Sequence, residues 1–269
     1  MAFNIDGLLE RLGIVRDESV GIAFSGGGAK GFSHIGVLMA FEHFGMLPNV
    51  LSGVSAGAIA ATLYGAGLSP HEMIECFTEA SRFADFTEWS LPKKGFLKLD
   101  RFGKLLESWL PVRNLEEMKI PTVICATDIE HGKSVGWGKG EIVPRVLASC
   151  SIPIIFNPVK INGVAYVDGG VLRNLPAWAI RDYCRILYGS NCTPLSQKYD
   201  KKGGLIEVAY RTFQLMMKAN MPQDLRLCDY VITSRQLTGI GTFDLSSINR
   251  GVTAGYDAAC RVLEAALNN

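Results

Sequence analysis

Two short apolar runs near the start of the chain each end at a turn of small residues, and each is followed by a helical pattern. Residues 20–24 are apolar and stop at Ser25 and three glycines, and residues 50–54 are a second such run. The largely apolar residues 32–44 and the Ala-rich residues 56–66 have the composition of buried helices. Repeated alternation of strand, sharp turn and helix predicts a parallel sheet with crossover helices, hence an α/β layered domain.

The same kind of pattern extends toward the end of the chain, and no internal repeat interrupts it. Further predicted elements are strands at 120–126, 132–137, 164–167 and 230–233 and helices at about 205–220 and 250–267. The polar residues from Ser190 to Gly204 predict a surface excursion. We therefore expect one domain over residues 1–269.

Residues 83–118 differ from the rest because aromatic and basic side chains are interspersed there. They include Phe83, Phe86, Trp89, Lys93, Lys94, Phe96, Lys98, Arg101, Lys104 and Trp109. Amphipathic helices packed on the sheet are the commoner origin of such a pattern. The alternative hypothesis is a cover region that forms an acyl entrance and makes peripheral contact with a membrane surface.

Composition argues against several classes of protein. The 269 residues are 48% hydrophobic, enough for a full core, and 27 basic residues against 26 acidic ones give no basic face for nucleic acid. Charged residues at positions 6, 10 and 11 interrupt any signal-peptide pattern, and no apolar stretch is long enough to span a membrane. Seven scattered cysteines without a Cys-x-x-Cys pair suit a reducing compartment and argue against zinc. We expect a soluble cytoplasmic protein without metal or cofactor.

A Gly-x-Ser-x-Gly pattern stands where the second predicted strand passes into a helix. It comprises Gly53, Val54, Ser55, Ala56 and Gly57, in the context that a nucleophile elbow requires. The two glycines are needed because the chain segments before and after so tight a turn approach closely. The pentapeptide alone is a weak signal, since Gly-rich turns also occur without catalysis.

The glycines after the first predicted strand suit a second chemical role. Gly26, Gly27 and Gly28 precede a helix, whose first amides point outward toward a site for a negative oxygen. Gly26, Gly28 and Gly31 also match Gly-x-Gly-x-x-Gly, which makes dinucleotide binding a rival. That rival requires an acidic residue about 20 positions further on, and residues 44–67 contain none.

The positions of the histidines favour a dyad over a triad. His34, His43, His71 and His131 all precede Asp168, whereas a Ser, acid, His order needs a histidine after the acid. Serine chemistry here then requires a carboxylate that takes the proton directly. Asp168 is the preferred carboxylate because it ends an apolar strand and precedes two glycines, although turn aspartates also bond their own backbone. The runner-up is Asp128, which ends another strand.

Taken together, these motifs resemble the patatin-like phospholipase family in order and approximate spacing. The resemblance rests on residues 26–31, 53–57 and 168–170, with residues 148–153 and 174–176 in support, and runs from about residue 20 to 183. Lys30 departs from it, since many members carry Arg there.

The resemblance implies a three-layer α/β/α fold with a mainly parallel sheet. It also implies cofactor-free hydrolysis of acyl-ester lipids by nucleophile Ser55 and base Asp168, with oxyanion donors on Gly26, Gly27 and Gly28. A thioesterase or acyltransferase on the same dyad, and a lipid-binding protein without turnover, remain alternatives.

Overall fold

The computed structural model describes residues 19–83, 99–194, 204–241 and 244–268. Within these residues an eight-stranded sheet runs in the order β5-β6-β3-β2-β1-β7-β8, with β4 also paired to β3. The strands are β1 Val20–Phe24, β2 Val50–Val54, β3 Thr122–Asp128, β4 Lys133–Trp137, β5 Val159–Ile161, β6 Val164–Asp168, β7 Ile186–Asn191 and β8 Tyr230–Thr233.

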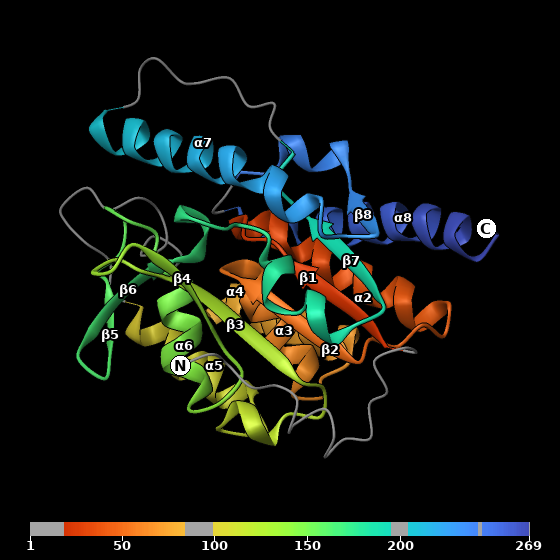
Figure 1. Cartoon of the computed structure of the whole chain (residues 1–269), viewed down its shortest axis with the longest axis horizontal. Coiled ribbons are helices and arrows are strands. Elements are labelled where there is room, and N and C mark those ends of the chain that lie inside the picture. The colour runs from red at the N-terminus through yellow and green to blue at the C-terminus, as the bar shows by residue number, and fades with distance from the viewer. Residues whose placement is uncertain (1–18, 84–98, 195–203, 242–243, 269) are drawn as a thin grey trace.

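Helices surround this sheet (Figure 1). The α-helices are α2 Phe32–His43, α3 Ala56–Gly65, α4 Pro70–Phe83, α5 Asp100–Trp109, α6 Ile142–Ser149, α7 Leu205–Leu225 and α8 Ile248–Leu267. Short 3₁₀ helices are η2 Gly28–Gly31, η4 Leu115–Glu117, η5 Gly169–Val171, η6 Pro176–Ala179, η7 Arg181–Tyr183, η8 Arg235–Gly239 and η9 Leu245–Ser247. No helix among the described residues combines the length and the apolar character that crossing a bilayer demands.

The centre of the sheet is parallel and one edge is antiparallel. β3, β2, β1, β7 and β8 pair parallel, whereas β4 and β6 pair antiparallel to β3, and β5 antiparallel to β6. The expectation of a mainly parallel central sheet is therefore confirmed.

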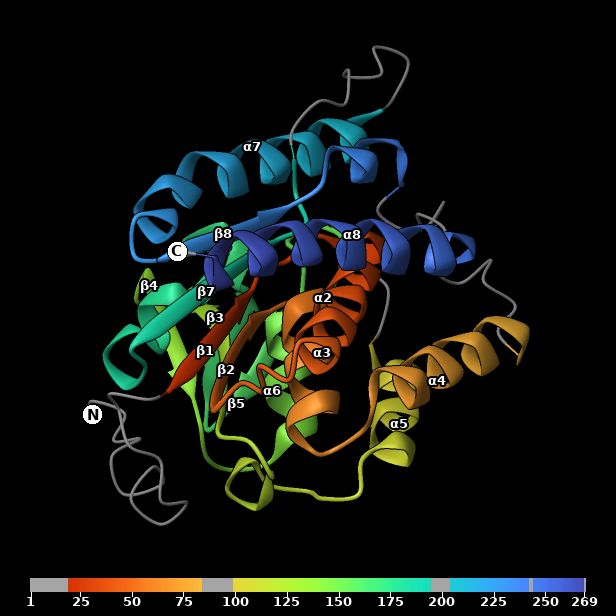
Figure 2. The same ribbon diagram turned by 90° about the vertical axis from the view of Figure 1, so that its right-hand side faces the viewer.

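Two apolar layers separate the sheet from its helices, which confirms the three-layer arrangement. Because side chains alternate along a strand, Ile22 and Phe24 of β1 face a core shared with α2, α3 and α8, and Ala23 faces the other side. That second core is closed by η6, η7 and the C-terminal part of α7, which contributes Met221. Figure 2 shows α2, α3 and α8 together on one side of the strands.

The largest error of the sequence interpretation concerns β7. Residues from Ser190 onward were expected in a surface excursion, yet Ser190 and Asn191 end a buried strand beside β1. The strand was missed because its last residues are polar. The Ser190 hydroxyl is instead satisfied in the interior, 2.8 Å from Nδ1 of His34.

Candidate active site

Ser55 occupies the sharp turn between β2 and α3. Its φ of 53° and ψ of −121° are unfavourable for a residue with a side chain, and its exposed fraction is only 7%. A Cβ atom at Gly53 would overlap the carbonyl oxygen of Gly57, and one at Gly57 would overlap that of Phe24. The need for glycine on both sides of this serine is therefore confirmed as a matter of backbone contact.

The end of α6 and the residues just after it hold both Ser55 and Asp168. The Ser55 backbone N–H donates to the Ser149 hydroxyl (2.8 Å), which itself donates to the Cys125 carbonyl of β3 (2.6 Å). Two residues further on, the Ser151 carbonyl accepts the Asp168 backbone N–H (2.9 Å). The serine turn and the end of β6 are thus fixed relative to each other by the Ser149 hydroxyl and the Ser151 carbonyl.

Asp168 is buried at the end of β6, with 1% of its surface exposed. Oδ1 accepts the Gly170 N–H (2.8 Å), whereas Oδ2 has no hydrogen-bond partner among the described residues. Burial raises the pKa of this carboxyl to about 7, although Gly170 and the Ser55 side chain act in the opposite direction. The Ser55 hydroxyl is therefore near enough to favour the charged form of Asp168.

The amides of the glycine loop are not equivalent. The Gly26 N–H, which was expected to be an oxyanion donor, donates to the Asn174 carbonyl (3.2 Å) in this conformation. The N–H groups of Gly27 and Gly28 have no such partner within the described part of the chain, and Gly28 has a φ of 60°. Ala56 begins α3, so its N–H belongs to a helix terminus of the kind that binds anions.

An apolar cavity of about 150 Å³ opens beside Ser55, Gly28 and Ala56. Other lining residues include Phe32, Ile35, Ile59, Ala60, Phe77, Phe102, Leu105, Trp109, Ile152 and Phe156. Arg101 is the one charged side chain among the described lining residues. An apolar cavity of this volume accepts a benzene-sized molecule, so there is room beside the serine for a stretch of hydrocarbon chain.

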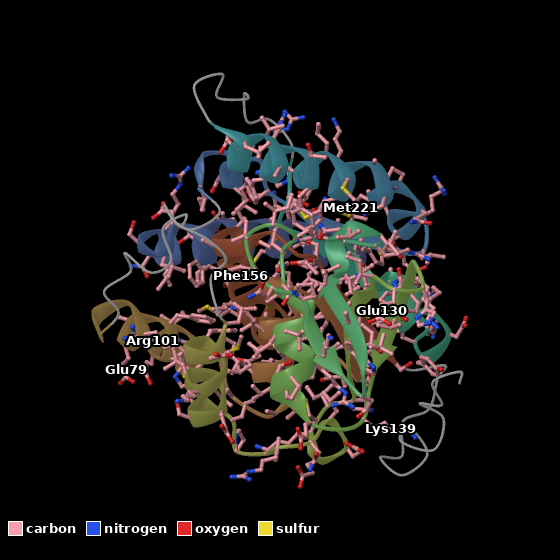
Figure 3. All side chains as sticks on the ribbon, turned by 90° about the vertical axis from the view of Figure 1, so that its left-hand side faces the viewer. Glu79, Arg101, Glu130, Lys139, Phe156 and Met221 are labelled. Atoms are coloured by element: carbon pink, nitrogen blue, oxygen red, sulfur yellow. The ribbon has the colours of Figure 1, made fainter. Side chains whose placement is uncertain are left out.

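Part of the expected cover region lines this cavity. α5 buries Phe102 and Leu106 in the core, as an amphipathic helix does, and also presents Leu105 and Trp109 to the cavity. Figure 3 labels Arg101 on α5 and Phe156 on the loop after α6. The other aromatic and basic positions between 84 and 98, with their expected membrane contact, lie outside the described residues.

Three of the histidines, His34, His43 and His131, have partners away from the serine. Both ring nitrogens of buried His34 are bonded, to the Ser190 hydroxyl and the Ser25 carbonyl, and burial lowers its pKa to about 4. The ring of His131 bonds Asp128 (2.9 Å) within the hairpin between β3 and β4. His43 lies 3.2 Å from the Tyr256 hydroxyl. In the described part of the chain, no histidine bonds Ser55 or Asp168.

Asp128, the runner-up acid, is a hairpin residue. Its Oδ1 accepts the backbone N–H groups of Glu130 (3.1 Å) and His131 (3.0 Å). Desolvation acts to raise the pKa of Asp128, but the bonds from His131 outweigh it and the pKa is lowered. This carboxylate is therefore stabilised in its charged form, unlike that of Asp168.

Sequence reasoning missed the residues around the two principal side chains. Cys150 lines the cavity, and burial raises the pKa of its thiol, with Asp168 raising it further. The Ser149 hydroxyl orients the serine turn, and the Asn174 carbonyl orients the glycine loop, because each accepts a backbone N–H. Both belong to motifs that supported the family resemblance, and that was the only signal for them in the sequence.

Several curated proteins are similar to the chain over part of its length. An uncharacterized NTE family protein of Mycobacterium tuberculosis is 27% identical over 175 residues, which are 65% of this chain and 30% of the relative. Lysophospholipase NTE1 of Debaryomyces hansenii is 26% identical over 176 residues, 62% of this chain and 11% of the relative. The chain thus spans less than a third of these two relatives.

Solved structures share the fold at low sequence identity. VipD from Legionella pneumophila has a TM-score of 0.61 at 15% identity and covers 93% of this chain and 67% of its own. Human GIVD cytosolic phospholipase A2, solved with a methyl gamma-linolenyl fluorophosphonate inhibitor, has a TM-score of 0.50 at 13% identity. The match covers 95% of this chain and 60% of the phospholipase chain. The patatin-like phospholipase family model matches residues 22–180, and the chain belongs to that family.

Proposed function

We propose that the chain hydrolyses acyl esters of lipids through a Ser55–Asp168 dyad. The observation that carries the proposal is a strained serine that lines an apolar cavity and has a buried carboxyl with a raised pKa beside it. A pKa of about 7 suits a group that must both accept and return a proton near neutral pH. The name lysophospholipase of the Debaryomyces hansenii relative agrees with a lipid substrate.

In the proposed reaction, Asp168 accepts the proton of Ser55 while the serine oxygen attacks the ester carbonyl. The amides of Gly27, Gly28 and Ala56 stabilise the oxygen that becomes negative. The alcohol leaves with the proton from Asp168, and an acyl-serine remains. Asp168 then takes a proton from water, whose oxygen attacks the acyl-serine; the bond to the serine oxygen breaks, Asp168 returns the proton to Ser55, and the fatty acid is released. We assign the acyl chain to the apolar cavity.

Replacing each of the two carboxylates at strand ends by an amide tests which of them is the base. Asp168→Asn is expected to lower ester turnover by about 10²- to 10⁴-fold, because the base is lost. Asp128→Asn is the matched control and should retain turnover, as should neutral substitution of His34 or His131 in folded protein. Turnover is measured with a soluble short-chain ester, together with circular dichroism for folding. Equal losses in Asp128→Asn and Asp168→Asn would refute the dyad.

A chelator is expected to leave turnover unchanged, because the serine, the carboxyl and the amides supply every step. Loss of activity that a divalent metal restores would count against this mechanism.

A further inference from the structure

One side of α7 lies against the turn that follows Asp168 (Figure 1). Phe213, Met217, Asn220 and Asp224 are spaced by four, three and four residues, which places them on one helix face. A Cβ atom at Gly170 would come within 3.0 Å of both Phe213 and Met217. The turn and the helix are therefore in close contact, without room between them.

Asn220 uses both ends of its amide in this contact. Its Nδ2 donates to the Gly170 carbonyl (2.9 Å), and its Oδ1 accepts the Asn174 backbone N–H (3.0 Å). Gly170 in turn donates its N–H to Oδ1 of Asp168 (2.8 Å). Asn174 accepts the Gly26 N–H through its carbonyl (3.2 Å). One side chain thus stands between the turn of the acid and the glycine loop.

An ion pair between Arg173 and the buried carboxylate of Asp224 anchors α7 to the loop that follows the Asp168 turn. Asp224 is fully buried and accepts two bonds from Arg173, at 2.8 Å to Nε and 2.6 Å to Nη2. It also accepts the Trp178 backbone N–H (3.2 Å). Two-pronged bonds between guanidinium and carboxylate fix geometry as well as distance. The position of Asn220 along α7 is thereby set.

We propose that Asn220 is a positioning residue that links the turn of Asp168 to the glycine loop. It keeps the carboxyl of Asp168 and the oxyanion donors of the loop in fixed positions relative to each other. The inference rests on the proposed function, because it assigns no chemistry of its own to Asn220. Within the described residues, Asn220 makes no hydrogen bond to Ser55 and does not line the cavity. Its loss should therefore slow the chemical step while leaving binding of the acyl chain nearly intact.

The test compares Asn220→Ala with Gln223→Ala, a matched amide removal at an exposed position of the same helix. Asn220→Ala is expected to lower kcat for a short-chain ester by about 10- to 100-fold, the scale of a 1 Å misplacement, with KM changed less than about threefold. Hydrogen exchange of the Asn174 amide should become faster. Gln223→Ala should match the parent protein in both measurements.

Different variants test this inference and the proposed function, so the failure of one can be distinguished from the failure of the other. If Asn220→Ala has the kcat of Gln223→Ala, or if it raises KM and leaves kcat unchanged, the positioning role is wrong. If Ser55→Ala retains full turnover, the proposed function itself is wrong. Should Asn220→Ala fail to fold, Asn220→Asp keeps the shape and the acceptor oxygen but cannot donate to Gly170, and the same loss of kcat is expected.

Discussion

Asp168 is held in a state that costs stability. With 1% exposure and an Oδ2 that has no partner among the described residues, the carboxyl loses solvation that the bond from Gly170 to Oδ1 replaces only in part, and its pKa rises to about 7 as a result. Ser55 adds backbone strain at the neighbouring turn, with a φ of 53°. Such costs gather at functional sites, and here they fall on the two residues assigned to the chemistry.

The raised pKa of Asp168 sets the expected pH dependence. The base must be ionised, so kcat/KM should fall by about tenfold per pH unit below an apparent pKa near 7 and level off above it. The measurement is a pH profile from 5 to 9 with a neutral short-chain ester, in a protein shown to be folded throughout. A profile flat down to pH 5 would contradict the state assigned to Asp168.

At the scale of single residues, the sequence predicts the residues that backbone geometry requires. It does not predict the residues that act through hydrogen bonds to distant parts of the chain. The glycines around Ser55 and after Asp168 follow from tight turns, which are local in sequence. Ser149 meets Ser55 across 94 positions of the chain, and nothing in a short pattern indicates such a partner. The bond from Gly26 to Asn174 was missed for the same reason, since it depends on how distant loops meet.

At the scale of elements, α3, α4 and α5 together shape the cavity. Ile59 and Ala60 come from α3, Phe77 from α4, and Trp109 from α5, with the rings of Phe77 and Trp109 in an edge-on contact at 5.3 Å. α4 and α6 were not predicted as helices, whereas α5 fits the amphipathic helices given as the commoner origin of the pattern at residues 83–118. α5 buries Phe102 and Leu106 on one side, as that prediction requires.

Filling the cavity from α3 tests its role as the acyl site. Ala60 is 4% exposed and lines the cavity, so Ala60→Leu should occupy space intended for the chain. We expect kcat/KM to fall by about tenfold or more for long-chain esters and by less than about twofold for an acetyl ester, because loss of buried CH₂ groups costs about 0.8 kcal/mol each. Equal losses on both substrates, with a lower Tm, would show a packing defect instead.

At the scale of the whole molecule, the sheet brings together turns that are far apart in the chain. The glycine loop follows β1, Ser55 follows β2, and these strands are parallel neighbours, so both turns meet at their carboxyl edge. Asp168 ends β6, which pairs antiparallel with β3 so that Asp168 lies opposite Ala126. The alternating pattern of the sequence predicted the parallel part, but the antiparallel pairing of β6 with β3 and the place of β7 between β1 and β8 depend on pairing choices that no local pattern carries.

The central claim is that Ser55 is the nucleophile, and covalent labelling tests it most directly. Incubation with a fluorophosphonate should add one phosphonyl group to the intact protein, and peptide mass spectrometry should locate it on Ser55. Ser55→Ala should take up none, whereas Ser134→Ala, a matched change in β4, should label at the parent rate. Labelling of a folded Ser55→Ala protein, or a modification mapped to another residue, would contradict the account.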